Sequence, residues 1–154
     1  MAQETFKLRI YLDTSVFSAY ADERLPDRQQ QTRDFWRRLG EFEPSTSELA
    51  RTELSLTTDQ SRRRALLRLL DEVEVMPILA EMTSLAQHYV GEGVFALADV
   101  NDALHVAAAV LMRQDVLVSW NFRHLVNRRR RAQVNEINVR AGLPQLDIVA
   151  PPEL

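Results

Sequence analysis

The chain has 154 residues, a length that fits one ordinary domain, and 45% of its residues are hydrophobic and 27% charged. The net charge of −3 argues against a generally basic nucleic-acid binder, and the lack of cysteine excludes disulfides, thiolate nucleophiles and zinc–sulfur sites. No apolar stretch is long enough to cross a bilayer, and the start Met1-Ala2-Gln3-Glu4 is polar rather than secretory. We therefore expect a cytoplasmic protein with a single domain over residues 1–154 and no membrane contact.

Short apolar runs alternate with helical patterns along the chain, which predicts a three-layer α/β/α sandwich around a mainly parallel five-stranded sheet. Thr46 or Ser47 is expected to cap a helix that ends near Leu56, and Thr58 or Asp59 the next one, toward Leu70. Further helices are predicted at 81–90 and at 101–113, and the second should be buried because it is apolar nearly all round. The predicted strands are residues 8–12, 42–46, 73–77, 116–120 and 146–150.

Asp13 is the most informative residue, because it directly follows the first predicted strand. In open α/β sheets, ligands bind at the edge formed by the carboxyl ends of the strands. We therefore take Asp13 as the anchor of a candidate active site.

Three further polar residues fall where this fold could bring them near Asp13. Glu53 lies on the helix after the second strand, Asp102 opens the buried helix, and Asn121 follows the fourth strand. The plain interpretation of Asp102 is a helix N-cap. Crowded carboxylates repel one another, so such a cluster favours a hard divalent cation with oxygen ligands, Mg²⁺ or Mn²⁺.

Other phosphate chemistries lack the residues they need. The four glycines, Gly40, Gly91, Gly93 and Gly142, build neither a phosphate-binding loop nor a dinucleotide fingerprint. A phosphatase of the haloacid dehalogenase type needs a second aspartate where Ser15 stands, and a response-regulator receiver needs a lysine other than Lys7, which precedes Asp13. A metal-dependent reaction is the stronger expectation.

The sequence resembles the PIN domain family, and within it the VapC-like toxins of bacterial toxin–antitoxin systems. The likeness is carried by Leu12-Asp13-Thr14-Ser15, by the helix with Glu53, and by the segments 102–109 and 117–127. The resemblance implies a Mg²⁺-dependent endoribonuclease in which Asp13, Glu53 and Asp102 bind the metal. It also implies an antitoxin partner and assembly as a homodimer or as a hetero-oligomer with that antitoxin.

The sequence departs from the family pattern at its fourth acidic position. Asn121 stands there, preceded by Ser119, and it offers a carbonyl oxygen but no charge. This departure puts a second metal ion in doubt. It also leaves open an alternative, a degenerate PIN domain that binds RNA or a partner protein without cleavage.

Several residues are held in reserve for the site. Glu48 rivals Glu53 as the second acid, although the family spacing favours Glu53, and Asp99 and Ser119 are close enough in sequence to contribute. His105, among apolar helix residues, is interpreted as a hydrogen-bonded core residue, and His124 as structural packing that could instead orient the region of Asn121.

A run of four arginines, Arg128, Arg129, Arg130 and Arg131, follows the last of these motifs. Such a run can hold RNA phosphates by a salt-sensitive attraction that is independent of sequence. It can equally be a solvated helix face or a docking site for an acidic partner segment. The sequence does not separate these three possibilities.

Overall fold

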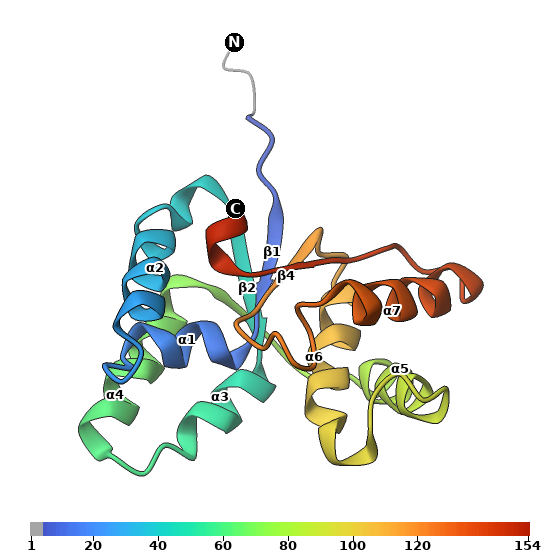
Figure 1. Ribbon diagram of the computed structural model, residues 1–154, viewed down its shortest axis with the longest axis horizontal. Helices are drawn as coiled ribbons and strands as arrows, with labels where there is room; N and C mark the ends of the chain where they lie inside the picture. Colours follow the sequence, from blue (N-terminus) through green and yellow to red (C-terminus); the bar gives the residue numbers. More distant parts are fainter. Residues whose placement is uncertain (1–4) are drawn as a thin grey trace.

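A computed structural model describes residues 5–154 and contains a five-stranded sheet in the order β3-β2-β1-β4-β5 (Figure 1). All four pairings between neighbouring strands are parallel, which confirms the expected sheet. The five predicted strands are confirmed, with small shifts at their ends. They are β1 (Arg9–Leu12), β2 (Glu43–Ser47), β3 (Glu74–Met76), β4 (Val116–Val118) and β5 (Asp147–Val149).

Helices cover both faces of the sheet, as expected for a three-layer sandwich (Figure 1). One layer consists of α1 (Thr14–Tyr20), α2 (Pro26–Arg37), α3 (Glu48–Ser55) and α4 (Gln60–Leu69). The other consists of α5 (Ala80–Gly91), α6 (Val100–Leu111) and α7 (Arg128–Arg140). Short 3-10 segments occupy Leu39–Glu41, Leu70–Glu72, Leu97–Asp99 and Pro151–Glu153.

The alternation of side chains along the strands creates a separate core on each face of the sheet. Ile10 and Leu12 pack in the cluster formed with α1 to α4, whereas Tyr11 and Leu117 pack in the cluster formed with α5 to α7. Helix α6 is buried, as predicted, and a run of small side chains lets it lie close to the sheet. That run includes Ala103, Ala107, Ala108 and Ala109, all fully buried.

The helix starts agree with the sequence in part. Asp59 caps α4 by accepting a hydrogen bond from the Arg62 amide at 2.7 Å. Ser47 stands at the N-cap of α3, but its side chain makes no capping bond there. The capping interpretation of Asp102 is wrong, because Asp99 occupies the N-cap of α6 and Asp102 lies in the first turn. The Asp102 carboxylate is therefore available for another role.

The polar start on which the expectation of no secretory segment depends lies in residues 1–4, outside the described residues. Within residues 5–154, none of the helices combines the length and the hydrophobicity that crossing a bilayer requires.

Candidate active site

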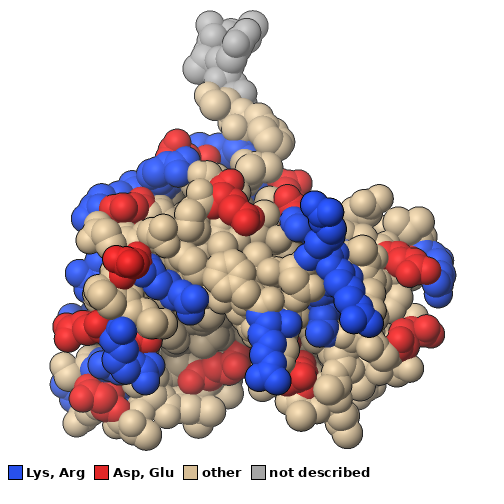
Figure 2. Space-filling model, viewed as in Figure 1, with Lys and Arg blue, Asp and Glu red and all other residues tan. Residues whose placement is uncertain are grey.

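The candidate site lies where β1 and β4 end at the carboxyl edge of the sheet. Asp13 directly follows β1, forms the N-cap of α1, and donates its backbone N–H to the Val118 carbonyl of β4 at 3.1 Å. Figure 2 shows acidic side chains in a hollow in the lower middle of this face of the molecule, with basic side chains beside it. This is the edge at which the sequence placed the site.

Asp13 is almost completely buried and is held by hydroxyl groups. Its Oδ1 accepts hydrogen bonds from the Ser15 amide, at 3.0 Å, and from the Ser15 hydroxyl, while its Oδ2 accepts one from the Ser119 hydroxyl at 2.6 Å. Burial raises the pKa of Asp13, and the charge of Asp102 adds to this, although the His105 ring and the two serines act in the opposite direction. The site therefore holds a carboxylate at an electrostatic cost, which a cation would offset.

Glu53 reaches the same region from α3. Its Oε1 accepts a hydrogen bond from the Thr14 hydroxyl at 2.8 Å and lies 2.6 Å from Nε2 of His105. Burial opposes the ionised form of Glu53, but the hydrogen bonds from His105 and Thr14 lower its pKa overall. Glu53 is therefore a carboxylate held beside Asp13 through the adjacent residue Thr14.

Asp102 contributes from the first turn of α6 and is paired with His124. Its Oδ2 lies 3.0 Å from Nδ1 of His124, and Asp99 approaches the same nitrogen at 3.6 Å. Possible ligand atoms of Asp99, Asp102 and His124 all lie within 4.8 Å of one another. The structure thus brings the reserve residue Asp99 next to Asp102.

Asn121, the residue at the fourth position of the family pattern, follows β4. Its Oδ1 accepts a hydrogen bond from the His124 backbone amide at 2.9 Å, so this side chain holds the turn that carries His124. Ser119 bonds directly to Asp13 instead, and its hydroxyl also accepts a hydrogen bond from the Asn121 amide at 2.9 Å. Of the two positions, Ser119 is the one in contact with the central carboxylate.

The three acids are linked through α6. Asp102 and His105 are three residues apart, which places them on neighbouring positions of one helix face. His105 in turn contacts Glu53, and Asp102 is near enough to influence the ionisation of Asp13. Carboxylate oxygens are the ligands that Mg²⁺ and Mn²⁺ prefer, so the chemistry of this donor set fits such an ion. Of the three acids, Asp102 alone belongs to the group of possible ligand atoms that lie within 4.8 Å of one another among residues 5–154.

Glu48 and the arginine run have other surroundings. Glu48 pairs with Arg51 at the surface, at 2.9 Å, whereas Glu53 is the one that contacts Thr14.

Within the run of four arginines, Arg130 lies over the Phe95 ring at 4.5 Å and Arg131 pairs with Asp147 at 2.8 Å. Arg128 and Arg129 are exposed. A cavity of about 330 Å³ nearby is lined by Gly93, Val94, Arg123, Asn127, Arg129, Arg130 and Gln133.

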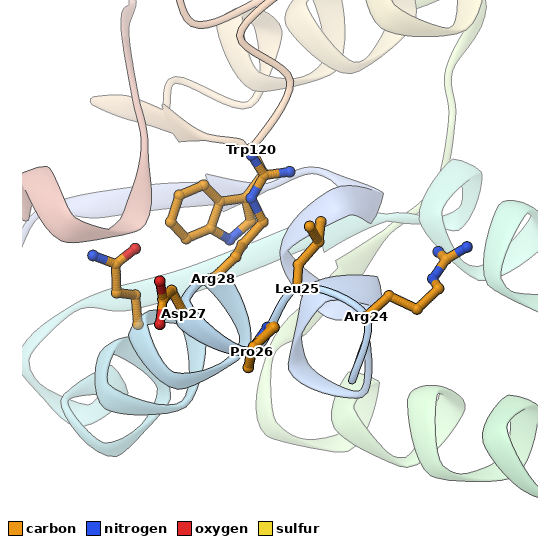
Figure 3. Close-up of a pocket in the computed structure, with 7 residues that line it drawn as sticks. Arg24, Leu25, Pro26, Asp27, Arg28 and Trp120 are labelled. Carbon is orange, nitrogen blue, oxygen red and sulfur yellow. The ribbon is translucent and has the colours of Figure 1, made fainter.

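A second hollow lies beside Trp120 (Figure 3). The Arg28 side chain lies across the Trp120 ring, with its guanidinium carbon 5.0 Å from the ring centre. An adjoining cavity of about 340 Å³ shares Arg28 and Trp120 and also reaches Ser15 and Asn121. Because Ser15 bonds to Asp13, this cavity is open space next to the acidic site.

Sequence reasoning missed several contacts of the site. Thr14 and Ser15 directly follow Asp13, and that position was the signal that they belong to the site. His105 is buried and hydrogen-bonded, as expected, but its bond to Glu53 was not foreseen. The available sequence signal was the spacing of three residues from Asp102, which places His105 on the same face of α6 as a predicted site residue. His124 was expected mainly to pack, and its pairing with Asp102 gives it a place in the site.

Comparisons with known proteins agree on the architecture. The sequence model of the PIN domain family matches residues 10–137. FitAcB from Neisseria gonorrhoeae is 13% identical and superposes with a TM-score of 0.59, covering 94% of this chain and 99% of that one. VapBC2 from Rickettsia felis, bound to a promoter DNA fragment, is 17% identical with a TM-score of 0.57, covering 92% and 98%.

A third structure is the Mycobacterium tuberculosis toxin VapC20, described as cleaving the sarcin–ricin loop. It is 19% identical to this chain, with a TM-score of 0.54, and the superposition covers 70% of this chain and 86% of that one. At such identities the three structures show a common fold. No curated protein has a sequence that matches this chain.

Proposed function

The chain belongs to the PIN domain family, and on this premise we propose that it is a metal-dependent endoribonuclease, the toxin of a toxin–antitoxin pair. The observation that carries the proposal is the buried Asp13 carboxylate, held at the carboxyl edge of the sheet next to Glu53 and Asp102. A buried carboxylate whose pKa is raised by burial and by the charge of a neighbouring acid favours a site that takes a divalent cation.

Each of the three acids has a proposed role in the reaction. Asp13 and Asp102 would hold the ion directly or through water, and Glu53 would either bind it or orient the attacking water. A bound Mg²⁺ or Mn²⁺ would supply positive charge that polarises the scissile phosphate and makes a water molecule more acidic. The water oxygen forms the new bond to phosphorus while the bond to the 3′-oxygen breaks. The products are a 5′-phosphate and a 3′-hydroxyl, which takes up the proton from the water.

Ser119 and Ser15 hold Asp13 in place, and Asn121 holds the turn with His124. We place the RNA backbone over the exposed Arg128 and Arg129, because Arg130 and Arg131 already have contacts within the protein. The cavity that reaches Ser15 and Asn121 gives an adjoining nucleotide space next to the acids.

We also propose a protein partner. Two of the similar structures are toxin–antitoxin assemblies from Rickettsia felis and Klebsiella pneumoniae. By analogy of fold, this chain binds a cognate antitoxin, as a homodimer or in a hetero-oligomer, and acts on RNA in the cytoplasm. Co-expression with a small protein encoded by a neighbouring reading frame, followed by co-purification, tests this part of the proposal.

The cleavage reaction is tested with metal-free protein and a structured RNA hairpin. We expect cleavage with Mg²⁺ or Mn²⁺ and none with a chelator. Asp13→Asn should lower the rate by roughly 10³-fold, since the metal supplies several kcal/mol of transition-state stabilisation. Asn retains an acceptor for the Ser15 amide, so circular dichroism should show an unchanged fold. Undiminished cleavage by Asp13→Asn would refute the assignment.

The alternative is a PIN domain that binds RNA or a protein without cutting, and Asn121 is the observation that favours it, because the fourth acid is lacking. The same assay separates the two. A binding module holds the hairpin equally well with Mg²⁺ or chelator and never shortens it.

A further inference from the structure

His105 is a deeply buried titratable group near the acids that the proposed reaction leaves without a role. Its side chain is 3% exposed, whereas that of Glu53 is 29% exposed. The ring contacts Glu53 through Nε2, at 2.6 Å, and Tyr11 through Nδ1, at 2.7 Å. It therefore joins an acid that faces the site to a hydroxyl in the core.

The hydrogen bonds form a chain with a defined direction. An ionised carboxylate only accepts hydrogen bonds, so Nε2 of His105 donates to Glu53. In the neutral ring Nδ1 is then an acceptor, and it receives the hydrogen of the Tyr11 hydroxyl. Ser47, whose Oγ lies 2.7 Å from the Tyr11 oxygen, donates to Tyr11. Hydrogen bonds that run in one direction polarise and strengthen one another.

The position of Ser47 supports this arrangement. Ser47 is the N-cap residue of α3, the helix that carries Glu53, yet its side chain makes no capping bond. A serine at this position usually bonds to an amide of the first turn. Here its hydroxyl contacts Tyr11, so the chain links the start of α3 to β1 and α6.

The hydrogen bonds to the Glu53 carboxylate involve one of its two oxygens. Thr14 and His105 both bond to Oε1, and among residues 5–154 the hydrogen bonds to the Glu53 carboxylate all involve this atom. Oε2 therefore retains its lone pairs. A carboxylate fixed through one oxygen presents the other as a ligand in a defined direction, the usual effect of a supporting hydrogen bond at a metal site.

We propose that His105 is a positioning residue, which, through the buried chain from Ser47 and Tyr11, fixes Glu53 so that Oε2 faces a divalent cation. The inference rests on the proposed function, because it assumes that Glu53 takes part in metal binding. It adds that α6 both supplies Asp102 and orients Glu53, so the two acids are placed by one helix.

Two substitutions distinguish the two nitrogens of the ring. The amide nitrogen of glutamine can occupy the place of Nε2, so His105→Gln keeps a donor for Glu53. The side-chain oxygen of asparagine, an acceptor, can occupy the place of Nδ1, so His105→Asn keeps a partner for the Tyr11 hydroxyl and loses the bond to Glu53. Both substitutions remove the aromatic ring from the core, so the loss of packing is similar in the two variants. His88→Asn, at an exposed position on α5, is the matched control.

The measurement is Mn²⁺ binding to metal-free protein by titration calorimetry, with no RNA present. Loss of a supporting residue costs about 10- to 100-fold in metal affinity, and we expect that loss in His105→Asn. His105→Gln should recover most of it, and His88→Asn should match the wild type. Equal affinities of wild type and His105→Asn, or equal losses in both His105 variants, would overturn the inference and leave the nuclease proposal standing.

A wild type that does not bind Mn²⁺ would overturn the proposed function together with this inference. If His105→Asn does not fold, Tyr11→Phe replaces it, because it removes only the hydroxyl that fixes the ring. A weaker Mn²⁺ affinity is then expected, and an unchanged one would refute the chain. Nitrogen-15 NMR of the metal-free wild type gives an independent check. The hydrogen of the neutral His105 ring should be on Nε2, and a hydrogen on Nδ1 alone would contradict the proposal.

Discussion

Glu53 and Asp102 are both paired with a histidine, but the two pairs differ in their access to water. The His105 side chain is 3% exposed and is also bonded to Tyr11, whereas the His124 side chain is 26% exposed and is shared between Asp102 and Asp99. Water can therefore reach both partners of the second pair, whereas in the first pair it can reach Glu53 but not His105.

This difference indicates that the site has a fixed side and an adjustable side. Glu53 is held by a buried chain that cannot rearrange without leaving polar groups unsatisfied in the core. The pair formed by Asp102 and His124 can exchange protein contacts for water at little cost. We expect the fixed side to set the direction of the ligands and the adjustable side to accommodate ions and substrate.

The largest effect on stability is expected on the fixed side, at Tyr11. Tyr11→Phe leaves the Ser47 hydroxyl and Nδ1 of His105 without their buried partner, which should lower the free energy of unfolding by about 1 to 3 kcal/mol. Urea unfolding of metal-free protein measures this. Tyr20→Phe is the control, because the Tyr20 hydroxyl makes none of the hydrogen bonds found among residues 5–154. Equal stabilities of the two variants would show that the chain contributes little.

The next expected effect is a pH-dependent change in stability at Asp13, which lies between the fixed side and the adjustable side of the site. Burial raises the pKa of Asp13 above its ordinary value of 3.8. Above pH 3.8 the unfolded chain therefore loses this proton first, and the stability that the group contributes is lost as the pH rises through the folded-state pKa. The Asp13→Asn variant has no titrating group at this position, so its stability does not fall in this way. Without metal, its free energy of unfolding at pH 7 should be at least as large as that of the wild type.

Urea unfolding with chelator between pH 4 and 7 tests this expectation. The difference in the free energy of unfolding between wild type and Asp13→Asn should become smaller as the pH falls toward 3.8. A variant less stable by more than about 1 kcal/mol at pH 7 would mean that the Asp13 carboxylate stabilises the start of α1 more than its burial costs.

A smaller effect is expected on the adjustable side. His124→Gln removes the ring nitrogen that faces Asp102, and it should weaken Mn²⁺ binding by less than about tenfold, because water replaces the lost contact. Calorimetry beside His105→Asn makes the comparison direct. A larger loss in His124→Gln than in His105→Asn would reverse the assignment of the two sides.

The smallest change in stability is expected at the exposed arginines. Arg129→Ala should leave unfolding nearly unchanged, since surface substitutions usually stay within about 0.5 kcal/mol. If Arg129 contacts one RNA phosphate, the salt dependence of RNA binding should fall by about 0.7 in the slope of log K against log salt. Fluorescence anisotropy with the Asp13→Asn protein measures this slope without cleavage. An unchanged slope would favour a solvated helix face.

Much of this arrangement follows from local sequence patterns. The alternation of apolar residues is sufficient to predict five parallel strands, and the placement of Asp13 at the end of β1 follows from it. The apolar composition of the segment around Ala107 is sufficient to predict a buried α6. These features depend on short-range periodicity, which a single sequence contains.

The tertiary structure decided the contacts between distant residues. His105 and Glu53 are 52 residues apart, and their contact depends on how α3 and α6 pack against β1. The structure also decided that Ser119 holds Asp13 and that Asn121 holds a turn, although both stand in one short segment. Sequence by itself determined which polar residues reach this edge of the sheet, because strand and helix periodicity are local. Which oxygen of each acid is held and which is left for a ligand depends on the packing of α3 and α6 around β1, and only the folded chain fixes that packing.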